Sequence, residues 1–345
     1  GARRETHQPP RNRRRMSRIV KVAAAQLGPI QRADSRASVI GRLLALMREA
    51  KSMGADVVVY PELALSAFFT KWYIPDEEKL EAEFFEREMP GPDTRVLFEE
   101  AARLGIGFHL GYAEVTVEAG VKRRFNTAIL VDATGRIVGK YRKIHLPGHP
   151  DYRPEYPIQD LEKMYFEIGD LGFPVFDVFG GVMGMCICND RRWPETYRVL
   201  GLQGVEMIFC GYNTPIHNPM AASEDHLQNF QNLLPMQAGA YQNASWVVGV
   251  AKCGVEDGWE MIGQSSIISP SGEIVAMCST LEDEIAFARC DLDRTAVYKH
   301  AVFDFAAHRR PEHYGLITSQ KGAISPFPRT DRPTERTVPA IHDEE

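Results

Sequence analysis

Cysteine is scarce in this chain, with six among 345 residues, and only Cys186 and Cys188 stand close together. No second ligand pair follows at the spacing of a structural zinc site, and scattered cysteines without a secretory leader indicate free thiols. The glycines at 105, 107 and 111 miss the spacing of a dinucleotide-binding loop. We therefore expect neither a metal nor an organic cofactor.

Positive charge is not in excess, because 40 Lys and Arg face 46 Asp and Glu, for a net charge of -6. This balance argues against a nucleic-acid binder. No apolar run approaches the roughly 18 residues of a membrane span, so we expect a cytoplasmic protein without a membrane partner. The one basic cluster, residues 11–15, precedes Met16 and is interpreted as part of a disordered leader over residues 1–17.

The chain also lacks internal repeats and a Pro-, Gly- and Ser-rich linker, which favours one domain over residues 18–318. The polar, Pro-containing residues 319–345 are interpreted as a C-terminal arm or tail. Strands are predicted over residues 19–27, 55–60, 106–115, 126–131, 136–141, 182–188, 205–209, 245–251, 265–268 and 273–277. Helices are predicted over residues 39–50, 96–104, 194–202, 224–241 and 294–303.

Turns at residues 132–135 and 270–272 each predict a hairpin between two strands. The mixture of hairpins with strand-helix alternation indicates mixed sheets with helices on both faces. So many strands are expected to split into two sheets that pack face to face between helix layers.

The most informative segment is residues 182–195, where an apolar strand ends at Cys188 and Pro194 opens a helix. A thiol in such a turn lies beside backbone N–H groups, which lower its pKa and can hold an oxyanion. An inert core cysteine is the alternative that this segment alone leaves open. Cys186 shares a strand face with Cys188, but only Cys188 reaches the turn, so Cys188 is the predicted nucleophile.

Two further strand ends carry ionisable side chains. Glu62 follows a β-branched run and a Tyr-Pro step, so it should emerge at the carboxyl end of a strand, where open α/β sheets place their sites. Lys143 follows a predicted hairpin strand in which charged and apolar residues alternate. Each residue alone is also typical of a solvated side chain at a strand end.

Together these segments resemble the nitrilase superfamily of carbon–nitrogen hydrolases. Glu62 after Tyr-Pro, Lys143 in Tyr-Arg-Lys-Ile-His-Leu, and Cys188 in Cys-Asn-Asp-Arg-Arg-Trp-Pro-Glu match its Glu-Lys-Cys triad in order and spacing. Within the superfamily the chain is most similar to the N-carbamoyl-D-amino acid amidohydrolases. That similarity is carried by residues 68–69, 88–92, 120–127, 145–149 and 211–215 and extends from about residue 18 to about residue 316.

The resemblance implies a four-layer α-β-β-α sandwich that assembles into a homodimer or homotetramer. It also implies hydrolysis of N-carbamoyl-D-amino acids to D-amino acid, carbon dioxide and ammonia through a carbamoyl thioester on Cys188. Glu62 would take the thiol proton, and Lys143 with the backbone N–H of Asn189 would hold the oxyanion. Glu162, in a Leu-Glu-Lys segment that matches the family, is the expected supporting carboxylate, with a solvated loop glutamate as the alternative.

A small-molecule substrate with a carboxylate requires a planar fork of donors, which arginine offers. Arg191 and Arg192 follow the nucleophile, and adjacent turn residues point in different directions, so we expect at most one to face the substrate. Two scaffold ion pairs are the alternative. Asn213, Thr214 and His145 match family positions that line the pocket, with a structural role as the alternative for His145.

The chain departs from the carbamoylases at several positions, because Asp160 and Gln231 replace histidines and residues 70–72 replace Pro-Arg-Trp. The triad is unaffected, but the pocket for the substrate's side chain differs. Other ureido or amide substrates therefore stay open, such as N-carbamoyl-β-alanine, N-carbamoylputrescine or an aliphatic amide. Arg191 and Arg192 disfavour an amine-tailed substrate by repulsion. A non-catalytic binding protein with the same fold is the remaining alternative.

Overall fold

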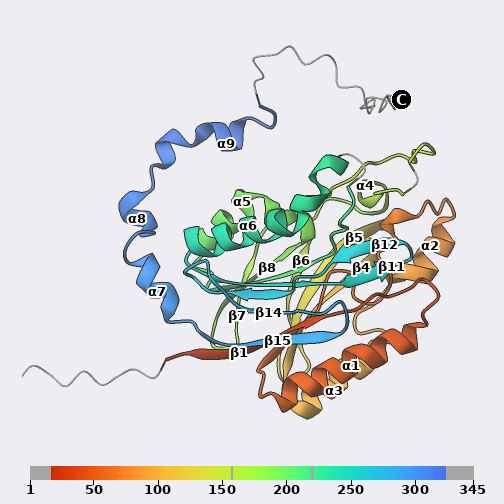
Figure 1. Ribbon diagram of the computed structural model, residues 1–345, viewed down its shortest axis with the longest axis horizontal. Helices are drawn as coiled ribbons and strands as arrows, with labels where there is room; N and C mark the ends of the chain where they lie inside the picture. Colours follow the sequence, from red (N-terminus) through yellow and green to blue (C-terminus); the bar gives the residue numbers. More distant parts are fainter. Residues whose placement is uncertain (1–16, 157, 219–220, 324–345) are drawn as a thin grey trace, which may run out of the picture.

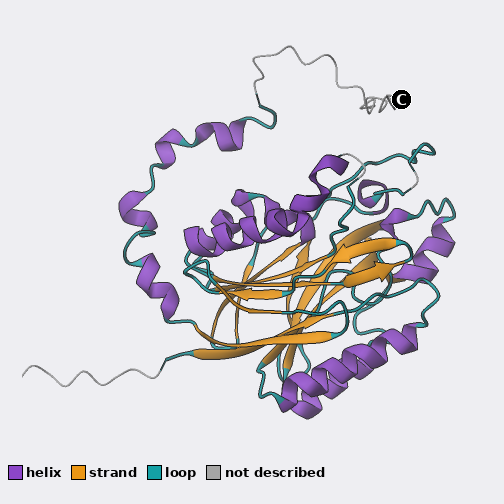
Figure 2. Ribbon diagram, viewed as in Figure 1, coloured by secondary structure: helices purple, strands orange, loops and turns teal. Residues whose placement is uncertain are grey.

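The computed structural model describes residues 17–156, 158–218 and 221–323, whose strands form two large sheets (Figure 1; Figure 2). The first sheet comprises β1 (Ile19–Gln26), β2 (Val57–Val59), β3 (Phe85–Glu86), β4 (Gly107–Glu118), β5 (Val121–Val131), β6 (Ile137–Arg142) and β15 (Glu284–Asp291). Its order is β15-β1-β2-β4-β5-β6, with β3 beside β4.

The second sheet comprises β7 (Val175–Val178), β8 (Gly181–Ile187), β9 (Met207–Tyr212), β10 (Trp246–Ala251), β13 (Ser266–Ile268) and β14 (Ile274–Met277). Its order is β14-β13-β10-β9-β8-β7. The centre of each sheet is parallel, with β1-β2-β4 in one and β8-β9-β10 in the other. Parallel strands bring their carboxyl ends to one edge, which is where ligand sites form in such sheets.

Helices cover the outer face of each sheet (Figure 1). The first sheet carries α1 (Arg36–Ser52) and α3 (Arg95–Leu104), and the second carries α5 (Pro194–Leu202) and α6 (Gln228–Gln242). The alternation of side chains along β1 shows how the layers form, since Val22 and Ala24 join the core between the sheets while Ala23 and Ala25 join the core under α1. The predicted four-layer α-β-β-α sandwich is confirmed.

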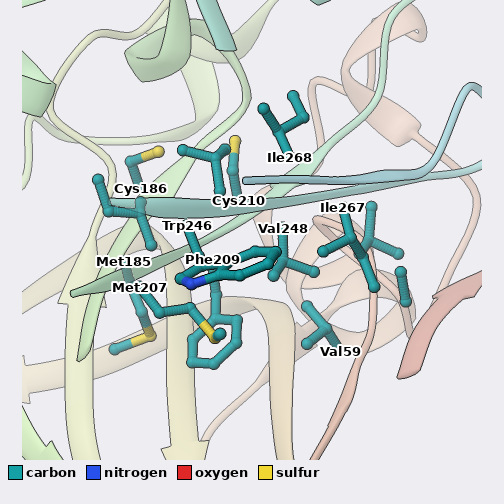
Figure 3. Packing of buried hydrophobic residues seen from close by; sticks show 14 of the residues in the cluster. Val59, Met185, Cys186, Met207, Phe209, Cys210, Trp246, Val248, Ile267 and Ile268 are labelled. Carbon is teal, nitrogen blue, oxygen red and sulfur yellow. The ribbon is translucent and has the colours of Figure 1, made fainter. Parts of the chain in front are cut away.

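The second sheet is apolar on both faces, as expected for a sheet buried between two layers. Met185 and Phe209 point from it toward the strand of the first sheet that carries Val59, whereas Cys186 and Cys210 point to the opposite side (Figure 3). All these side chains are less than 1% exposed. This packing fixes the ends of β8 and β9, from which the loops of the site emerge.

Every predicted strand and both predicted hairpins are present, with ends shifted by a few residues. The helix predicted over residues 224–241 begins with a 3-10 segment, Ala222–Leu227, before α6, and the one predicted over 294–303 stops earlier, as α7 (Arg294–Lys299). Among the elements that the sequence patterns did not predict are β7, β15, α2 (Glu77–Phe84) and the small sheet of β11 (Cys253–Glu256) and β12 (Trp259–Ile262).

After β15 the chain curves away from the sheets through α7, α8 (Phe305–His308) and α9 (Gly315–Ser319) (Figure 1). Leu316 and Ile317 on α9 are 72% and 60% exposed. Most of the expected leader and tail lies outside the described residues. Within the described ranges, no helix combines the length and the apolar composition needed to cross a membrane.

Candidate active site

Three ionisable side chains meet where strands of both sheets end. Glu62 follows β2, Lys143 follows β6, and Cys188 follows β8 at the start of a 3-10 turn, Cys188–Arg192. The Lys143 ammonium donates to Glu62 Oε1 over 2.8 Å, and both side chains are fully buried. Both also interact electrostatically with the Cys188 thiol, so the structure brings the predicted triad together at the strand ends.

Two glycines make room for the turn that carries Glu62. A Cβ atom on Gly111 of β4 would lie 2.7 Å from the Pro61 carbonyl oxygen, and one on Gly211 of β9 would lie 2.5 Å from the Glu62 nitrogen. Any larger side chain at either position would displace this backbone. A glycine inside a strand often marks such a close approach, so these two were a readable signal in the sequence.

The Glu62 carboxylate is fixed by donors from several strands. Besides Lys143, the amide of Asn126 on β5 donates to Oε1 over 2.8 Å, and the backbone N–H of Asn213 donates to Oε2 over 3.0 Å. The Asn213 side chain also donates to the Glu62 carbonyl oxygen over 2.9 Å. Asn213 therefore positions the carboxylate as well as lining the pocket. The role of Asn126 was not predicted from the sequence.

Cys188 has a strained backbone, with φ of +47°, a region that residues other than glycine rarely adopt. The turn is held by Asp190, whose carboxylate accepts from the backbone N–H groups of Ile187 and His145 and from the Tyr141 hydroxyl. These three bonds tie the end of β8 to the end of β6. Asp190 was not recognised from the sequence, although it belongs to the motif that carries the nucleophile.

The pKa of the Cys188 thiol differs from the one predicted from the sequence. The turn was expected to lower the thiol pKa, but burial and the Glu62 charge raise the pKa of Cys188 to about 12, against the opposing effect of Lys143. The sulfur lies 3.3 Å from the Asn213 carbonyl oxygen, as a protonated thiol donor would. Cys188 therefore rests as a thiol and needs a base to become a nucleophile.

Glu162 opens α4 (Glu162–Tyr165) and is fully buried beside Lys143, which donates to its Oε2 over 2.6 Å. Burial raises the pKa of Glu162 to about 8, despite the adjacent ammonium. Burial alone would lower the pKa of Lys143, but its three acidic neighbours, Cys188, Glu162 and Glu62, raise it well above its ordinary value. Lys143 thus stays cationic, and with two of its three N–H donors in use, one is left for a substrate oxygen.

Arg191 and Arg192 have different surroundings. Arg191 is fully buried and donates to Asn232, to the Thr214 hydroxyl and to the Cys188 carbonyl oxygen. These bonds occupy its guanidinium, and Arg191 does not line the cavity, so Arg191 does not fit the predicted substrate role. Arg192 is exposed, lines the cavity, and makes no hydrogen bond or ion pair with a described residue.

His145 also lies outside the predicted role. Its Nδ1 is 2.7 Å from Asp190 Oδ1, and its ring stacks on Trp193 with the centroids 5.2 Å apart. It is not among the residues that line the cavity. The structure places it as a brace for the nucleophile turn, through Asp190 rather than through Glu62 or Lys143.

The thiol opens into a cavity of about 530 Å³, a size typical of small-molecule sites. Among the predicted site residues, the lining includes Glu162, Cys188, Asn189, Arg192, Asn213 and Thr214. Two of the positions at which the chain departs from the carbamoylases, Asp160 and Gln231, line it as well. The cavity therefore joins the reacting groups to residues that differ from the family pattern.

We expect activity to survive metal removal. Base, nucleophile and oxyanion donor are all side chains or backbone groups, and no cluster of three His, Cys, Asp or Glu in the described part of the chain is arranged to hold a metal. Extensive dialysis against EDTA should leave the rate of ammonia release unchanged, whereas iodoacetamide should abolish it. A loss in EDTA that zinc restores would contradict this mechanism.

Comparison with known proteins identifies the family of this chain. The sequence profile of the carbon–nitrogen hydrolases matches residues 21–300. An N-carbamoylputrescine amidase from Solanum tuberosum is 31% identical over 317 residues, covering 89% of this chain and 97% of the relative. A citrullinase from Francisella tularensis is 27% identical over 306 residues, covering 86% and 98%.

The crystal structure of a carbon–nitrogen hydrolase from Helicobacter pylori G27 has the same fold, with a TM-score of 0.75 at 22% identity. The match covers 88% of this chain and 99% of that one. The chain belongs to the carbon–nitrogen hydrolase family, whose members are hydrolases of non-peptide carbon–nitrogen bonds.

Proposed function

We propose that this protein hydrolyses N-carbamoyl-D-amino acids to the D-amino acid, carbon dioxide and ammonia. The observation that carries the proposal is that Cys188, beside the buried Glu62–Lys143 pair, lines the same cavity as an Arg192 that no described residue pairs with. The triad supplies the chemistry, and the guanidinium supplies a fork for a carboxylate. The preference for the D configuration rests on the sequence motifs shared with the carbamoylases.

In the first half-reaction, Glu62 takes the proton of the Cys188 thiol as the sulfur attacks the ureido carbon. The free N–H of Lys143 and the backbone N–H of Asn189 hold the oxyanion that forms, a contribution of about 10²–10³ in rate per donor. Collapse of the tetrahedral intermediate breaks the bond to the substituted nitrogen. That nitrogen takes the proton from Glu62 and leaves as the amino acid, with the carbamoyl group on sulfur.

In the second half-reaction, Glu62 takes a proton from a water molecule, which attacks the carbamoyl thioester. The same donors hold the second oxyanion. The carbon–sulfur bond breaks, the thiol regains its proton, and carbamic acid leaves and decomposes to carbon dioxide and ammonia. Glu162 contacts Lys143 rather than the thiol, so its role is to hold the ammonium at the carbonyl position.

Replacing Arg192 by Met should lower kcat/KM for an N-carbamoyl-D-amino acid by roughly 10- to 100-fold, the value of a charge-assisted bidentate contact. The carboxamide analogue of the same substrate should be affected much less, because a neutral amide never used the full charge. Both are measured by ammonia release. Equal losses on the two substrates would move the carboxylate site elsewhere.

Arg191→Met is the matched control for this experiment. It should destabilise the fold by about 3 kcal/mol, because Asn232, Thr214 and the Cys188 carbonyl lose their shared donor. Thermal unfolding therefore separates the two arginines: Arg192→Met should unfold near the parent temperature and Arg191→Met several degrees lower.

The substrate class itself is tested with a panel of D- and L-N-carbamoyl amino acids, N-carbamoyl-β-alanine, N-carbamoylputrescine and aliphatic amides. The proposal expects the highest kcat/KM for the D-carbamoyl amino acids. N-carbamoylputrescine belongs in the panel because the Solanum tuberosum relative is named for it. A panel in which only the diamine derivative or only simple amides are hydrolysed would overturn the proposal and keep the family chemistry.

A further inference from the structure

Asp160 lines the cavity and lies two residues before Glu162 in the sequence. Its backbone is held on both sides by His149, whose N–H donates to the Asp160 carbonyl oxygen over 2.9 Å and whose Nε2 lies 3.4 Å from the Asp160 nitrogen. Gly148 packs so closely that a Cβ atom there would lie 2.1 Å from the same carbonyl. The position of Asp160 is therefore fixed by the fold.

The Asp160 carboxyl accepts a hydrogen bond from the backbone of Glu162 but forms no ion pair with a described residue. Its Oδ1 is buried and accepts no hydrogen bond from them. A buried carboxyl oxygen without a donor costs roughly 1–3 kcal/mol, so a carboxyl in this state in the wall of a ligand cavity calls for a functional explanation. A cationic group on a bound molecule would supply the charge partner that the carboxyl lacks.

The nearby cations do not supply this donor. Lys143 bonds Glu62 and Glu162, and Arg153 pairs with Asp151. The Nδ1 of His149 lies 2.6 Å from the Asp151 carbonyl oxygen, so Nδ1 carries the hydrogen and Nε2 is an acceptor. Burial raises the pKa of Asp160, with Lys143 acting in the opposite direction, as expected for a carboxyl that lacks a cation of its own.

The cavity is therefore lined by two groups of opposite charge type that form no ion pair with a described residue: the Arg192 guanidinium and the Asp160 carboxyl. The sequence had disfavoured an amine-bearing substrate because two arginines were expected near it. The structure removes that objection, since Arg191 is committed to the scaffold and Asp160 adds an acid.

We propose that Asp160 is a specificity-determining residue that binds a cationic nitrogen on the side chain of the substrate. This inference rests on the proposed function and deepens it. The favoured substrate is an N-carbamoyl-D-amino acid with its carboxylate at Arg192 and an ammonium group at Asp160. A neutral side chain would leave the carboxyl without a cationic partner.

The test compares Nα-carbamoyl-D-lysine with its uncharged isostere, N-carbamoyl-D-2-aminoheptanoic acid, in which a methyl group replaces the ammonium. The readout is the ratio of the two kcat/KM values, because any disturbance of the triad affects both substrates equally and cancels. The parent enzyme should favour the lysine derivative by roughly 10- to 100-fold, and Asp160→Asn should bring the ratio near one.

Glu155→Gln is the matched control, since it removes the same charge from the same loop at an exposed position outside the cavity lining. Its ratio should equal that of the parent. A parent ratio at or below one would overturn the Asp160 inference, while turnover of the isostere would leave the proposed function standing.

Equal losses on both substrates in Asp160→Asn would also overturn the inference, because they would place the residue at the ureido group or in the scaffold. If neither compound and no other N-carbamoyl-D-amino acid is hydrolysed, the proposed function itself fails. The two failures are therefore separate results of one experiment.

Discussion

Cys188→Ala is expected to abolish turnover, with kcat lowered by roughly 10⁴-fold or more. The covalent intermediate needs a sulfur at this turn, and the other described groups around it can only transfer protons, orient the substrate or stabilise charge. Cys188 lines the cavity, whereas Cys186 is fully buried. The rate of ammonia release at a saturating substrate concentration, measured on correctly folded protein, gives the change in kcat directly.

Cys186→Ala is the matched control, because it removes a sulfur from the same strand two residues earlier. It should keep most of the activity and lose about 1 kcal/mol of stability, as for a small core truncation. Mass spectrometry of the parent, quenched during turnover, should find the carbamoyl adduct on the peptide with Cys188. An active Cys188→Ala beside an inactive Cys186→Ala would reverse the assignment.

The fold could be predicted where burial leaves a simple pattern in the sequence. The β-branched run of β2 and the apolar run of β8 mark strands buried on both faces, and the resemblance supplied the layer order. The edge strand β15 was missed because it begins in an acidic segment and its exposure follows no regular alternation. Its partner is β1, far away along the chain, so nothing local marks it as a strand.

The site was predictable at the ends of strands and less so at the contacts between them. Glu62, Lys143 and Cys188 carry motifs, whereas the hydrogen bond from Asn126 to Glu62 joins residues 64 positions apart. The thiol pKa was predicted in the wrong direction because the turn alone was considered. Burial and the Glu62 carboxylate outweigh the turn, and both appear only once the sheets are packed together.

Glu62→Gln and Lys143→Met should each lower kcat by roughly 10²–10⁴-fold with little change in KM, because the base and the oxyanion donor act mainly in the transition state. The double variant should be little worse than either single one. Glu62 and Lys143 share one hydrogen bond and one transition state, so removing either disables the unit. Saturation kinetics on the three variants measures the coupling.

Stability must be measured alongside, because both residues are fully buried. Lys143→Met leaves Glu62 and Glu162 without their shared cation, a loss of roughly 3–5 kcal/mol if both stay charged. The Glu162 carboxyl, with its pKa of about 8, can relieve part of that loss by holding a proton. Because removal of Lys143 raises the pKa of Glu162 further, the Lys143→Met defect in stability should grow as the pH rises above about 8. A near-normal kcat in either folded variant would remove that residue from the triad. A low kcat together with this pH-dependent loss of stability would show that the buried Glu62–Lys143–Glu162 cluster serves both catalysis and stability.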